Sequence, residues 1–311
     1  DHVTEGRIGW NCVTGSNDGA AQNYGHEGQR PHDDRYEVAD EFADVVTRLW
    51  EAWEPDAVVL DRDKPMFADG SKVHPINHDG KYFKVRGPIN APRSPQGRVP
   101  ICQAGGSPRG QAFAARWADT IITNAVSIEG MKSFREEVRR LAASFGRDPD
   151  RIKVLFLAYP VIDTTMEAAR ERRRLEQEDA GRHLDLQLSG MSRLTNIDFS
   201  QFDLDEPLPP LTTNGHQSTL AKWIGKTPRS LASGLTSRQG VDFVGTADHV
   251  AGLMQEIMQE VGGDGFLLFN ATFDRRYIME VCDGLVPELQ RRGLVRRQYA
   301  HKHLRDNLLE F

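Results

Sequence analysis

Residues 99–110 read Val99-Pro100-Ile101-Cys102-Gln103-Ala104-Gly105-Gly106-Ser107-Pro108-Arg109-Gly110, and this stretch decides the fold. A short apolar run ends in a turn of small residues, and a helical pattern follows from Gln111 to Ala118. The pattern predicts a strand, a loop the size of a phosphate group and a helix N-terminus, where backbone N–H groups and the helix dipole favour an anion. An ordinary strand-to-helix turn has the same Gly-Gly-Ser pattern, so the stretch alone leaves both interpretations open.

A second polar cluster lies upstream of this stretch. Residues 7–14 form a buried-strand pattern with polar residues at its C-terminal end, and a Gly/Asn-rich loop leads from there to His32. Apolar residues then recur at helical spacing, at Val38, Phe42, Val45, Val46 and Leu49. His32 and Tyr36 are four residues apart and share a face on the first turn of this helix, where a phosphate could be held. Taken singly, His32 is typical of a helix cap and Asn11 of a turn, so the prediction rests on the set.

Five groups of residues, in order along the chain, match a known family. They are Trp10-Asn11-Cys12-Val13-Thr14; His32-Asp33-Asp34-Arg35-Tyr36 with Ala39-Asp40-Glu41-Phe42; Arg86-Gly87-Pro88; Pro95-Gln96-Gly97; and Gln103-Ala104-Gly105-Gly106-Ser107-Pro108. The set resembles the reduced-flavin-dependent monooxygenases of the bacterial luciferase superfamily, in the branch with nitrilotriacetate monooxygenase and dibenzothiophene-sulfone monooxygenase. The resemblance runs from Arg7 nearly to the end of the chain, where residues 304–308 match the terminal segment of the family.

Three further segments are most similar to the aminopolycarboxylate enzymes of that branch, which act on nitrilotriacetate or ethylenediaminetetraacetate (EDTA). They are Asn196-Ile197-Asp198-Phe199, Thr213-Asn214-Gly215-His216-Gln217 and Gly262-Gly263-Asp264-Gly265-Phe266. The resemblance therefore implies oxygen insertion at an N–CH2 carbon, followed by collapse of the product to glyoxylate and a shortened amine.

Alternating strand and helix patterns predict an α/β fold with a parallel sheet. The apolar β-like runs are residues 8–13, 99–104, 120–123, 152–158 and 265–270. Five such units are too few to close an eight-stranded barrel. The resemblance implies a (β/α)8 TIM barrel, so we expect a single barrel domain over residues 1–311 that starts near the fourth strand. On this interpretation about three βα units, roughly 100 residues or more, are absent upstream, since the chain begins at Asp1 rather than Met.

Two insertions, residues 56–96 and 166–240, interrupt the alternation of strands and helices. The first has a hairpin-like pattern at residues 80–85. The second begins with a helix that carries Arg170, Arg172, Arg173 and Arg174, which alternate with glutamates and predict a solvated face. Long loops in a compact domain usually form lids or oligomer contacts.

The resemblance implies FMN as the cofactor, used as FMNH2 and supplied by a separate NAD(P)H:FMN oxidoreductase. It assigns six residues to the flavin: Ser107, Gly106, His32, Tyr36, Asn11 and Thr14. Ser107 and Gly106 would bind the phosphate, and His32 and Tyr36 would complete that site. Asn11 and Thr14 would lie near the ribityl chain or ring edge. Many relatives have Ser directly after the Val-Thr pair, whereas this chain has Gly15 and then Ser16, so a hydroxyl contact is expected to be missing or shifted.

A substrate with several carboxylates needs cations, and arginine is the residue best suited to bidentate contacts with carboxylates. The candidates in the second insertion are Arg193, Lys222, Lys226, Arg229 and Arg238. Such substrates often arrive as metal chelates, so a metal would come with the substrate rather than through protein ligands. We interpret His74 and His78, in a loop or hairpin, as surface residues and predict no metal site in the protein. No catalytic residue is assigned.

Three alternatives stay open at the level of the sequence. One is a monooxygenase of the same family for an apolar substrate, such as a sulfone or alkane. Another is a non-catalytic flavin-binding fragment, and a third, less favoured by the motifs, is a deazaflavin-dependent dehydrogenase of the same superfamily.

Composition narrows the class of protein further. With 39% apolar residues, 27% charged residues and a mean hydropathy of −0.53, the chain has the composition of a globular protein and no membrane segment. A net charge of −6 argues against broad nucleic-acid binding. Cys12, Cys102 and Cys282 are widely spaced in or beside apolar segments, which predicts buried free thiols of a reducing compartment, hence the cytoplasm. Family precedent implies a homodimer or homotetramer.

Overall fold

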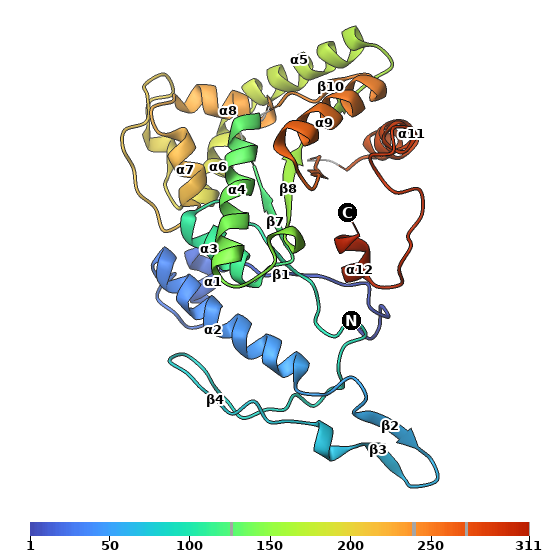
Figure 1. The fold of residues 1–311 in the computed structure, drawn as a ribbon. Coiled ribbons are helices and arrows are strands. Elements are labelled where there is room, and N and C mark those ends of the chain that lie inside the picture. Colours follow the sequence, from blue (N-terminus) through green and yellow to red (C-terminus); the bar gives the residue numbers. More distant parts are fainter. Residues whose placement is uncertain (125–126, 238–240, 271–272, 311) are drawn as a thin grey trace.

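The computed structural model describes residues 1–124, 127–237, 241–270 and 273–310 (Figure 1). At its centre lies a five-stranded parallel sheet in the order β1-β6-β7-β8-β11. The strands are β1 (Trp10–Asn11), β6 (Ile101–Gln103), β7 (Thr120–Thr123), β8 (Lys153–Ala158) and β11 (Phe266–Leu268). Each falls within a run that the sequence predicts, so the prediction of a parallel α/β sheet is confirmed.

Four helices form a layer on one face of this sheet (Figure 1). They are α2 (His32–Glu51), α3 (Pro108–Trp117), α4 (Ile128–Ser144) and α9 (Ala247–Val261). Helix α2 packs on α3, α3 on α4 and α4 on α9. Right-handed crossovers between strands that are neighbours in chain order place their helices on the same face, which is the arrangement of a (β/α)8 barrel. Among the described residues the sheet is an open arc of five strands and does not close.

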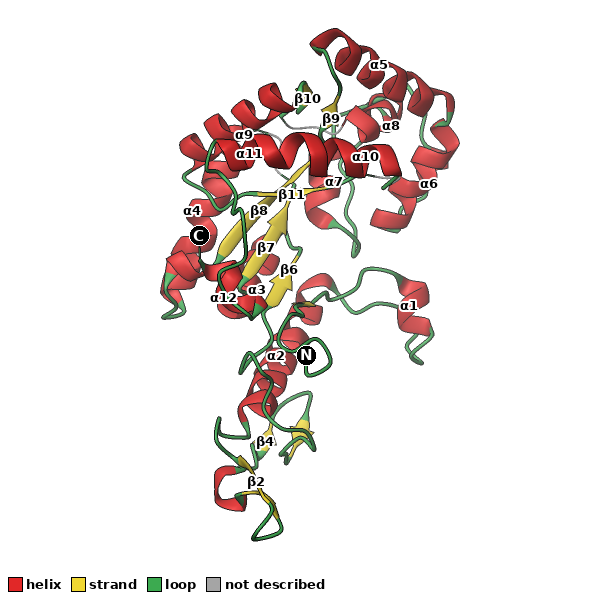
Figure 2. Cartoon of the chain, turned by 90° about the vertical axis from the view of Figure 1, so that its right-hand side faces the viewer, coloured by secondary structure: helices red, strands yellow, loops and turns green. Residues whose placement is uncertain are grey.

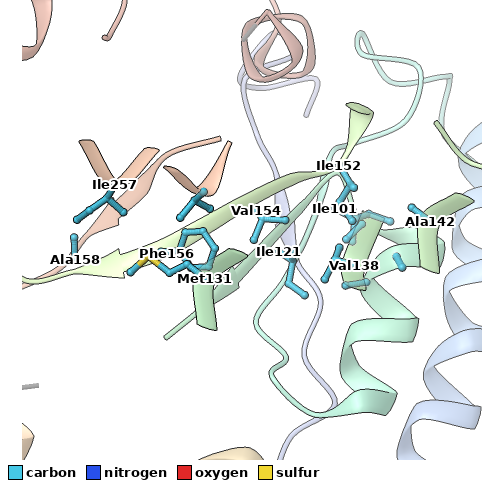
Figure 3. Packing of buried hydrophobic residues seen from close by; sticks show 14 of the residues in the cluster. Ile101, Ile121, Met131, Val138, Ala142, Ile152, Val154, Phe156, Ala158 and Ile257 are labelled. Atoms are coloured by element: carbon cyan, nitrogen blue, oxygen red, sulfur yellow. The ribbon is translucent and has the colours of Figure 1, made fainter. Parts of the chain in front are cut away.

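The main core fills the space between the sheet and these helices (Figure 3). Ile101, Ile121, Val154 and Phe156 are fully buried and share one face of the sheet, as their register requires. They pack against side chains of α4 and α9, including Met131, Val138, Ala142 and Ile257. Burying each large aliphatic or aromatic side chain contributes roughly 1.5–3 kcal/mol, so this layer dominates the stability of the sheet.

The opposite face of the sheet is more open. The apolar side chains that alternate with the core residues, Cys102, Ile122, Leu155 and Leu157, are only half-buried there, and Leu267 on the edge strand is exposed. In a closed barrel this face would be the interior.

The helices begin where hydroxyl side chains cap them. Ser107 Oγ accepts a hydrogen bond from Gly110 N at 3.1 Å at the start of α3, and Ser127 Oγ accepts one from Gly130 N at 3.0 Å at the start of α4. Helix α3 begins earlier than expected because Pro108 occupies its first turn, where a missing N–H costs nothing. These caps fix the geometry of each strand-to-helix loop.

The segment of residues 56–96 extends away from the sheet and carries two hairpins (Figures 1 and 2). They are β2 (Val58–Asp61) with β3 (Met66–Ala68), and β4 (His78–Asp79) with β5 (Lys84–Val85), separated by η1 (Gly70–Lys72). The second hairpin lies where the pattern at residues 80–85 predicts it.

The segment of residues 166–240 is mainly helical and has a small core of its own. Its elements are α5 (Met166–Arg182), α6 (Leu184–Thr195), η3 (Phe199–Gln201), α7 (Gln217–Trp223) and α8 (Pro228–Ser237). Flanking it, β9 (Val161–Ile162) and β10 (Val244–Gly245) pair in parallel. The remaining elements are α1 (Asp18–Gln22), η2 (Pro149–Arg151), α10 (Arg275–Met279), η4 (Glu280–Leu285), α11 (Val286–Arg291) and α12 (Leu304–Leu309). No helix in the described part of the chain is long and apolar enough to cross a membrane.

The solvated arginine face predicted for α5 is wrong for two of its residues. Arg173 is buried and donates to the carbonyl of Tyr159 at 3.2 Å, and Arg172 donates to Glu280 at 2.6 Å. Arg170 is exposed as expected, and Arg174 with its glutamate partners also follows the surface pattern. Arginines 172 and 173 instead join α5 to the rest of the fold.

Two other surface or burial predictions are also wrong. The side chain of His78 is only 11% exposed, because its Nε2 contacts the Glu41 carboxylate of α2 at 3.0 Å, whereas His74 is exposed as expected. Cys282 is exposed, although Cys12 is buried and burial raises the pKa of its thiol to about 11.

Candidate functional site

A cavity of about 330 Å³ opens beyond the carboxyl ends of β1 and β6. Three loops line it: residues 13–16 after β1, residues 103–107 after β6, and residues 215–218 at the start of α7. The first turn of α2 closes it with His32, Arg35 and Tyr36. The carboxyl ends of parallel strands are where α/β folds place their ligands.

The loop after β6 is tightly packed at its glycines. A Cβ on Gly105 would lie 3.3 Å from the hydroxyl of Tyr36, and one on Gly106 would lie 3.0 Å from Ser218 Oγ. Ser107 is buried at the end of this loop, with its Oγ 3.3 Å from His32 Nε2. The loop therefore presents bare backbone and one hydroxyl to the cavity at the N-terminus of α3.

Helix α2 supplies the opposite wall. His32 Nδ1 lies 2.7 Å from Asp33 Oδ1, so both of its ring nitrogens have partners in this structure. The hydroxyl of Tyr36 accepts a hydrogen bond from Gln103 Nε2 at 3.3 Å. Burial raises the pKa of Tyr36 above its ordinary value of 10, although hydrogen bonds to Thr14 and Ser107 oppose the shift. The phenol thus keeps its proton at neutral pH and can donate it.

Arg35 is a site residue that the sequence prediction missed. It is buried, and its two terminal nitrogens donate to the carbonyls of Arg30 at 2.9 Å and Asn214 at 2.7 Å. Its Nε has no hydrogen-bond partner within the described residues. Arg35 follows His32 by three positions, and that helical spacing could have placed it on the same face.

His216 is a second missed residue, at the start of α7. Although the residue is exposed, its pKa is lowered from the ordinary 6.5, first because the surrounding protein partly desolvates the ring and then because the cations of Arg193 and Arg35 are close to it. The imidazole is therefore neutral at pH 7 and can accept as well as donate a proton.

Five of the six predicted flavin residues line this cavity: Ser107, Gly106, His32, Tyr36 and Thr14. Asn11 does not. It lies on β1 in register with Cys102, which places it on the open face of the sheet. Gly15 and Ser16 also line the cavity, so a hydroxyl still borders it at the shifted position.

The predicted substrate cations separate into two groups. Lys222 donates to the carbonyl of Asn124, just beyond β7, at 2.7 Å, and desolvation lowers its pKa from the ordinary 10.5. Arg193 is exposed but close enough to His216 to shift its pKa. Arg229 is instead held by Asp205 through two contacts of 2.7 and 2.9 Å.

None of the four predicted cations that the structure describes is among the residues that line the cavity. Lys226 is exposed and does not line it, and Arg238 lies outside the described residues. Within the described part of the chain, no group of three or more His, Cys, Asp or Glu side chains could hold a metal ion.

The chemistry of the lining suits an anion. Hydroxyl, imidazole, guanidinium and phenol groups face the cavity, and no Asp or Glu is among the described residues that line it. Arg35 Nε and Gln103 Oε1 are buried without hydrogen-bond partners in the described structure. Unpartnered buried polar groups are rare and costly, and a bound phosphate, which accepts hydrogen bonds, would suit the donor Arg35 Nε but not the acceptor Gln103 Oε1. The residues present therefore fit the phosphate end of a flavin mononucleotide.

A parallel sheet wound in barrel order, with a glycine-rich loop and a helix N-terminus at the carboxyl ends of its strands, is typical of enzymes that bind a phosphorylated cofactor. Comparison with known proteins gives the family. Residues 1–265 match the luciferase-like monooxygenase family, and the chain belongs to it. It is a flavin-dependent monooxygenase.

Three relatives show the range of this family. Dibenzothiophene-sulfone monooxygenase of Rhodococcus erythropolis is 37% identical over 320 residues, which cover 99% of this chain and 70% of the relative. Nitrilotriacetate monooxygenase component A of Aminobacter aminovorans is 36% identical over 322 residues, which cover 99% of this chain and 70% of the relative. The crystal structure of a riboflavin lyase with modified FMN and riboflavin matches with a TM-score of 0.88 at 32% identity, covering 99% of this chain and 68% of that one.

Proposed function

We propose that the cavity binds the phosphate end of reduced FMN and that the enzyme oxygenates an aminopolycarboxylate, such as nitrilotriacetate or EDTA, with release of glyoxylate. The observation that carries the proposal is a cavity lined by hydrogen-bond donors and a guanidinium, without a carboxylate among its described lining residues. The similarity to a nitrilotriacetate enzyme supports the substrate class.

Each lining residue has a distinct role in this proposal. Ser107 and the backbone at Gly106 bind phosphate oxygens at the N-terminus of α3, where the helix dipole favours negative charge. His32 and Tyr36 donate from the opposite wall, and the cation of Arg35 offsets the charge. Thr14 also lines the cavity, three residues after Asn11 of β1, and these two would meet the rest of the cofactor. Reduced FMN, when bound, supplies the reaction with O2.

The protein must also keep water away and position the substrate. The half-buried apolar side chains of the open face, among them Leu155 and Leu157, provide a dry surface beside the cofactor site. Lys222 and Arg193, near the same carboxyl edge of the sheet, are the cations that we assign to substrate carboxylates. The neutral imidazole of His216 is suited to move a proton between substrate and solvent.

A separate NAD(P)H:FMN oxidoreductase would supply FMNH2. The relative that acts on nitrilotriacetate is named a component A, which fits a system of two components.

A second candidate is an apolar substrate, such as a sulfone or alkane. The open face with its aliphatic side chains favours it, and so does the similarity to a sulfone monooxygenase. Lys222 discriminates between an aminopolycarboxylate and an apolar substrate, because only the aminopolycarboxylate has carboxylates that this cation could bind.

The test is oxygen-dependent release of glyoxylate from nitrilotriacetate and from magnesium EDTA. The assay contains FMN, NADH, an unrelated flavin reductase and catalase, which removes free peroxide. We expect Lys222→Met to raise KM for the polycarboxylate about tenfold or more, because a lost charge-assisted hydrogen bond costs roughly 1.5–3 kcal/mol. The matched control Lys226→Met should leave KM unchanged. If the enzyme releases no glyoxylate but oxidises a sulfone or an alkane, the proposed substrate class is wrong. The proposed flavin site is unaffected by that result.

A further inference from the structure

The loop between β6 and α3 has two glycines directly before Ser107, and glycine leaves its backbone free to rotate. The peptide that joins Gly106 to Ser107 is trans, so its carbonyl and its N–H point in opposite directions. A phosphate in the cavity needs the N–H, since a carbonyl oxygen facing it would repel its charge. The orientation of this one peptide therefore decides whether the loop attracts or repels an anion.

The side chain of Gln111, near the start of α3, holds the carbonyl of this peptide. It is half-buried, and its Nε2 donates a hydrogen bond to Gly106 O at 3.1 Å. Gln111 does not line the cavity, whereas Gly106 and Ser107 do. The carbonyl of Gly106 is thus bound to a side chain outside the cavity, and the N–H of Ser107 points the other way.

The N–H of Ser107 is available to a ligand. Within the described part of the chain, no group accepts a hydrogen bond from the backbone N–H of Gly106 or of Ser107. Two other positions of this helix terminus offer no free donor, because Gly110 N donates to Ser107 Oγ at 3.1 Å and Pro108 has no N–H. Unpartnered backbone donors at the N-terminus of a helix are the groups that bind anions in proteins.

We infer that Gln111 is a positioning residue: by holding the carbonyl of Gly106, it directs the N–H of Ser107 at the phosphate of the cofactor. This role rests on the proposed function of the cavity, to which it adds a second donor besides the hydroxyl of Ser107. Gln111 itself does not touch the phosphate. Without its side chain the peptide is free to turn, and its carbonyl oxygen then faces the anion in part of the molecules.

Gln111→Met removes the donor and nearly keeps the length of the side chain. We expect reduced FMN to bind this variant about tenfold more weakly in anaerobic fluorescence titration, because one charge-assisted hydrogen bond is lost. Reduced riboflavin, which lacks the phosphate, should bind the variant and the wild-type protein equally well. The ratio of the two dissociation constants therefore reports the orientation of the peptide, whereas general damage to the site would weaken both flavins alike.

Gln290→Met is the matched control. Gln290 of α11 is also half-buried, and its Nε2 donates to a backbone carbonyl, that of Arg296, at 3.0 Å. It does not line the cavity, so this variant should keep the wild-type ratio. Urea unfolding of both variants measures what each contact contributes to folding stability.

Ser107→Pro removes the N–H itself. The φ angle of Ser107 is −74°, which proline can adopt, and the N–H has no partner to lose in the described structure. This variant also lacks the hydroxyl, so its reference is Ser107→Ala, and the ratio should be about tenfold smaller in Ser107→Pro than in that reference. Adding Gln111→Met should lower the ratio in the alanine background and have a smaller effect in the proline background, where no N–H remains to be directed.

A wild-type ratio that persists in Gln111→Met would overturn the role of Gln111 and leave the phosphate site in place. Equal weakening of both flavins in that variant would also overturn it, since the contact would then support the loop without directing a donor. If the wild-type protein itself binds the two flavins equally, the proposed function fails together with this role.

Discussion

Ser107 has one role in the cofactor site and another in the fold, and replacing it with alanine removes both. Its hydroxyl accepts a hydrogen bond from Gly110 N at 3.1 Å and so caps α3. The same hydroxyl lines the cavity, where its proton is available to a phosphate oxygen. The variant therefore loses both contacts at once.

The two losses have different magnitudes. Loss of an N-terminal cap costs about 1 kcal/mol of folding stability. Loss of a hydrogen bond to a charged phosphate costs about 1.5–3 kcal/mol of binding free energy, which corresponds to roughly a tenfold to hundredfold weaker affinity for FMNH2. We expect Ser107→Ala to show both effects.

Ser127→Ala is the matched control. Ser127 caps α4 in the same way, with Gly130 N at 3.0 Å, and does not line the cavity. Urea unfolding measures the stability of both variants, and anaerobic fluorescence titration measures their affinity for FMNH2. Both should lose about 1 kcal/mol of stability, and only Ser107→Ala should bind the flavin more weakly. Equal affinities for FMNH2 in the two variants would refute the assignment of the phosphate to this loop.

Three further predictions follow from the same contacts. The pKa of His216 is lower in the folded protein than in the unfolded one, so below about pH 6.5 the unfolded protein binds more protons. The free energy of unfolding should therefore fall as the pH drops through that range. Urea unfolding of His216→Gln should show a smaller fall. Gly106→Ala should weaken FMNH2 binding at least tenfold in the same titration, with little loss of stability, because its Cβ enters the cradle and its nearest neighbour is the Ser218 side chain, whose hydroxyl lies 3.0 Å away and can rotate. Asp119→Asn leaves Arg305 without its buried counter-charge, so it should lower the free energy of unfolding by about 3–5 kcal/mol and expose the C-terminal helix α12 to limited proteolysis.

The sequence predicts the fold well because strand and helix periodicities are local. Each predicted strand run contains a strand, yet β1 has two residues where residues 8–13 are expected. Among the described residues it is an edge strand that pairs only with β6, through Trp10 opposite Ile101 and Asn11 opposite Cys102, so hydrogen bonds to one neighbour alone define its length. The Gly-Gly-Ser loop and the first turn of α2 meet as predicted because both follow or face the carboxyl ends of neighbouring strands.

The residues that the sequence misplaces depend on contacts between distant segments. His78 has the sequence context of a surface loop, and only the packing of its hairpin on α2 brings it to Glu41. Arg229 and Lys222 lie on neighbouring helices, but Asp205 holds the first at the surface while the second reaches the carbonyl of Asn124. Periodicity carries no information about such partners.

The central claim is that this cavity recognises a phosphate, and the most direct measurement compares FMN with riboflavin. The two molecules differ only in that group, so the ratio of their dissociation constants isolates the contribution of the cavity. Two or more charge-assisted hydrogen bonds predict that reduced FMN binds about a hundredfold or more tightly than reduced riboflavin in anaerobic titration. The ratio should shrink in Ser107→Ala. Equal affinity for the two flavins would contradict the account.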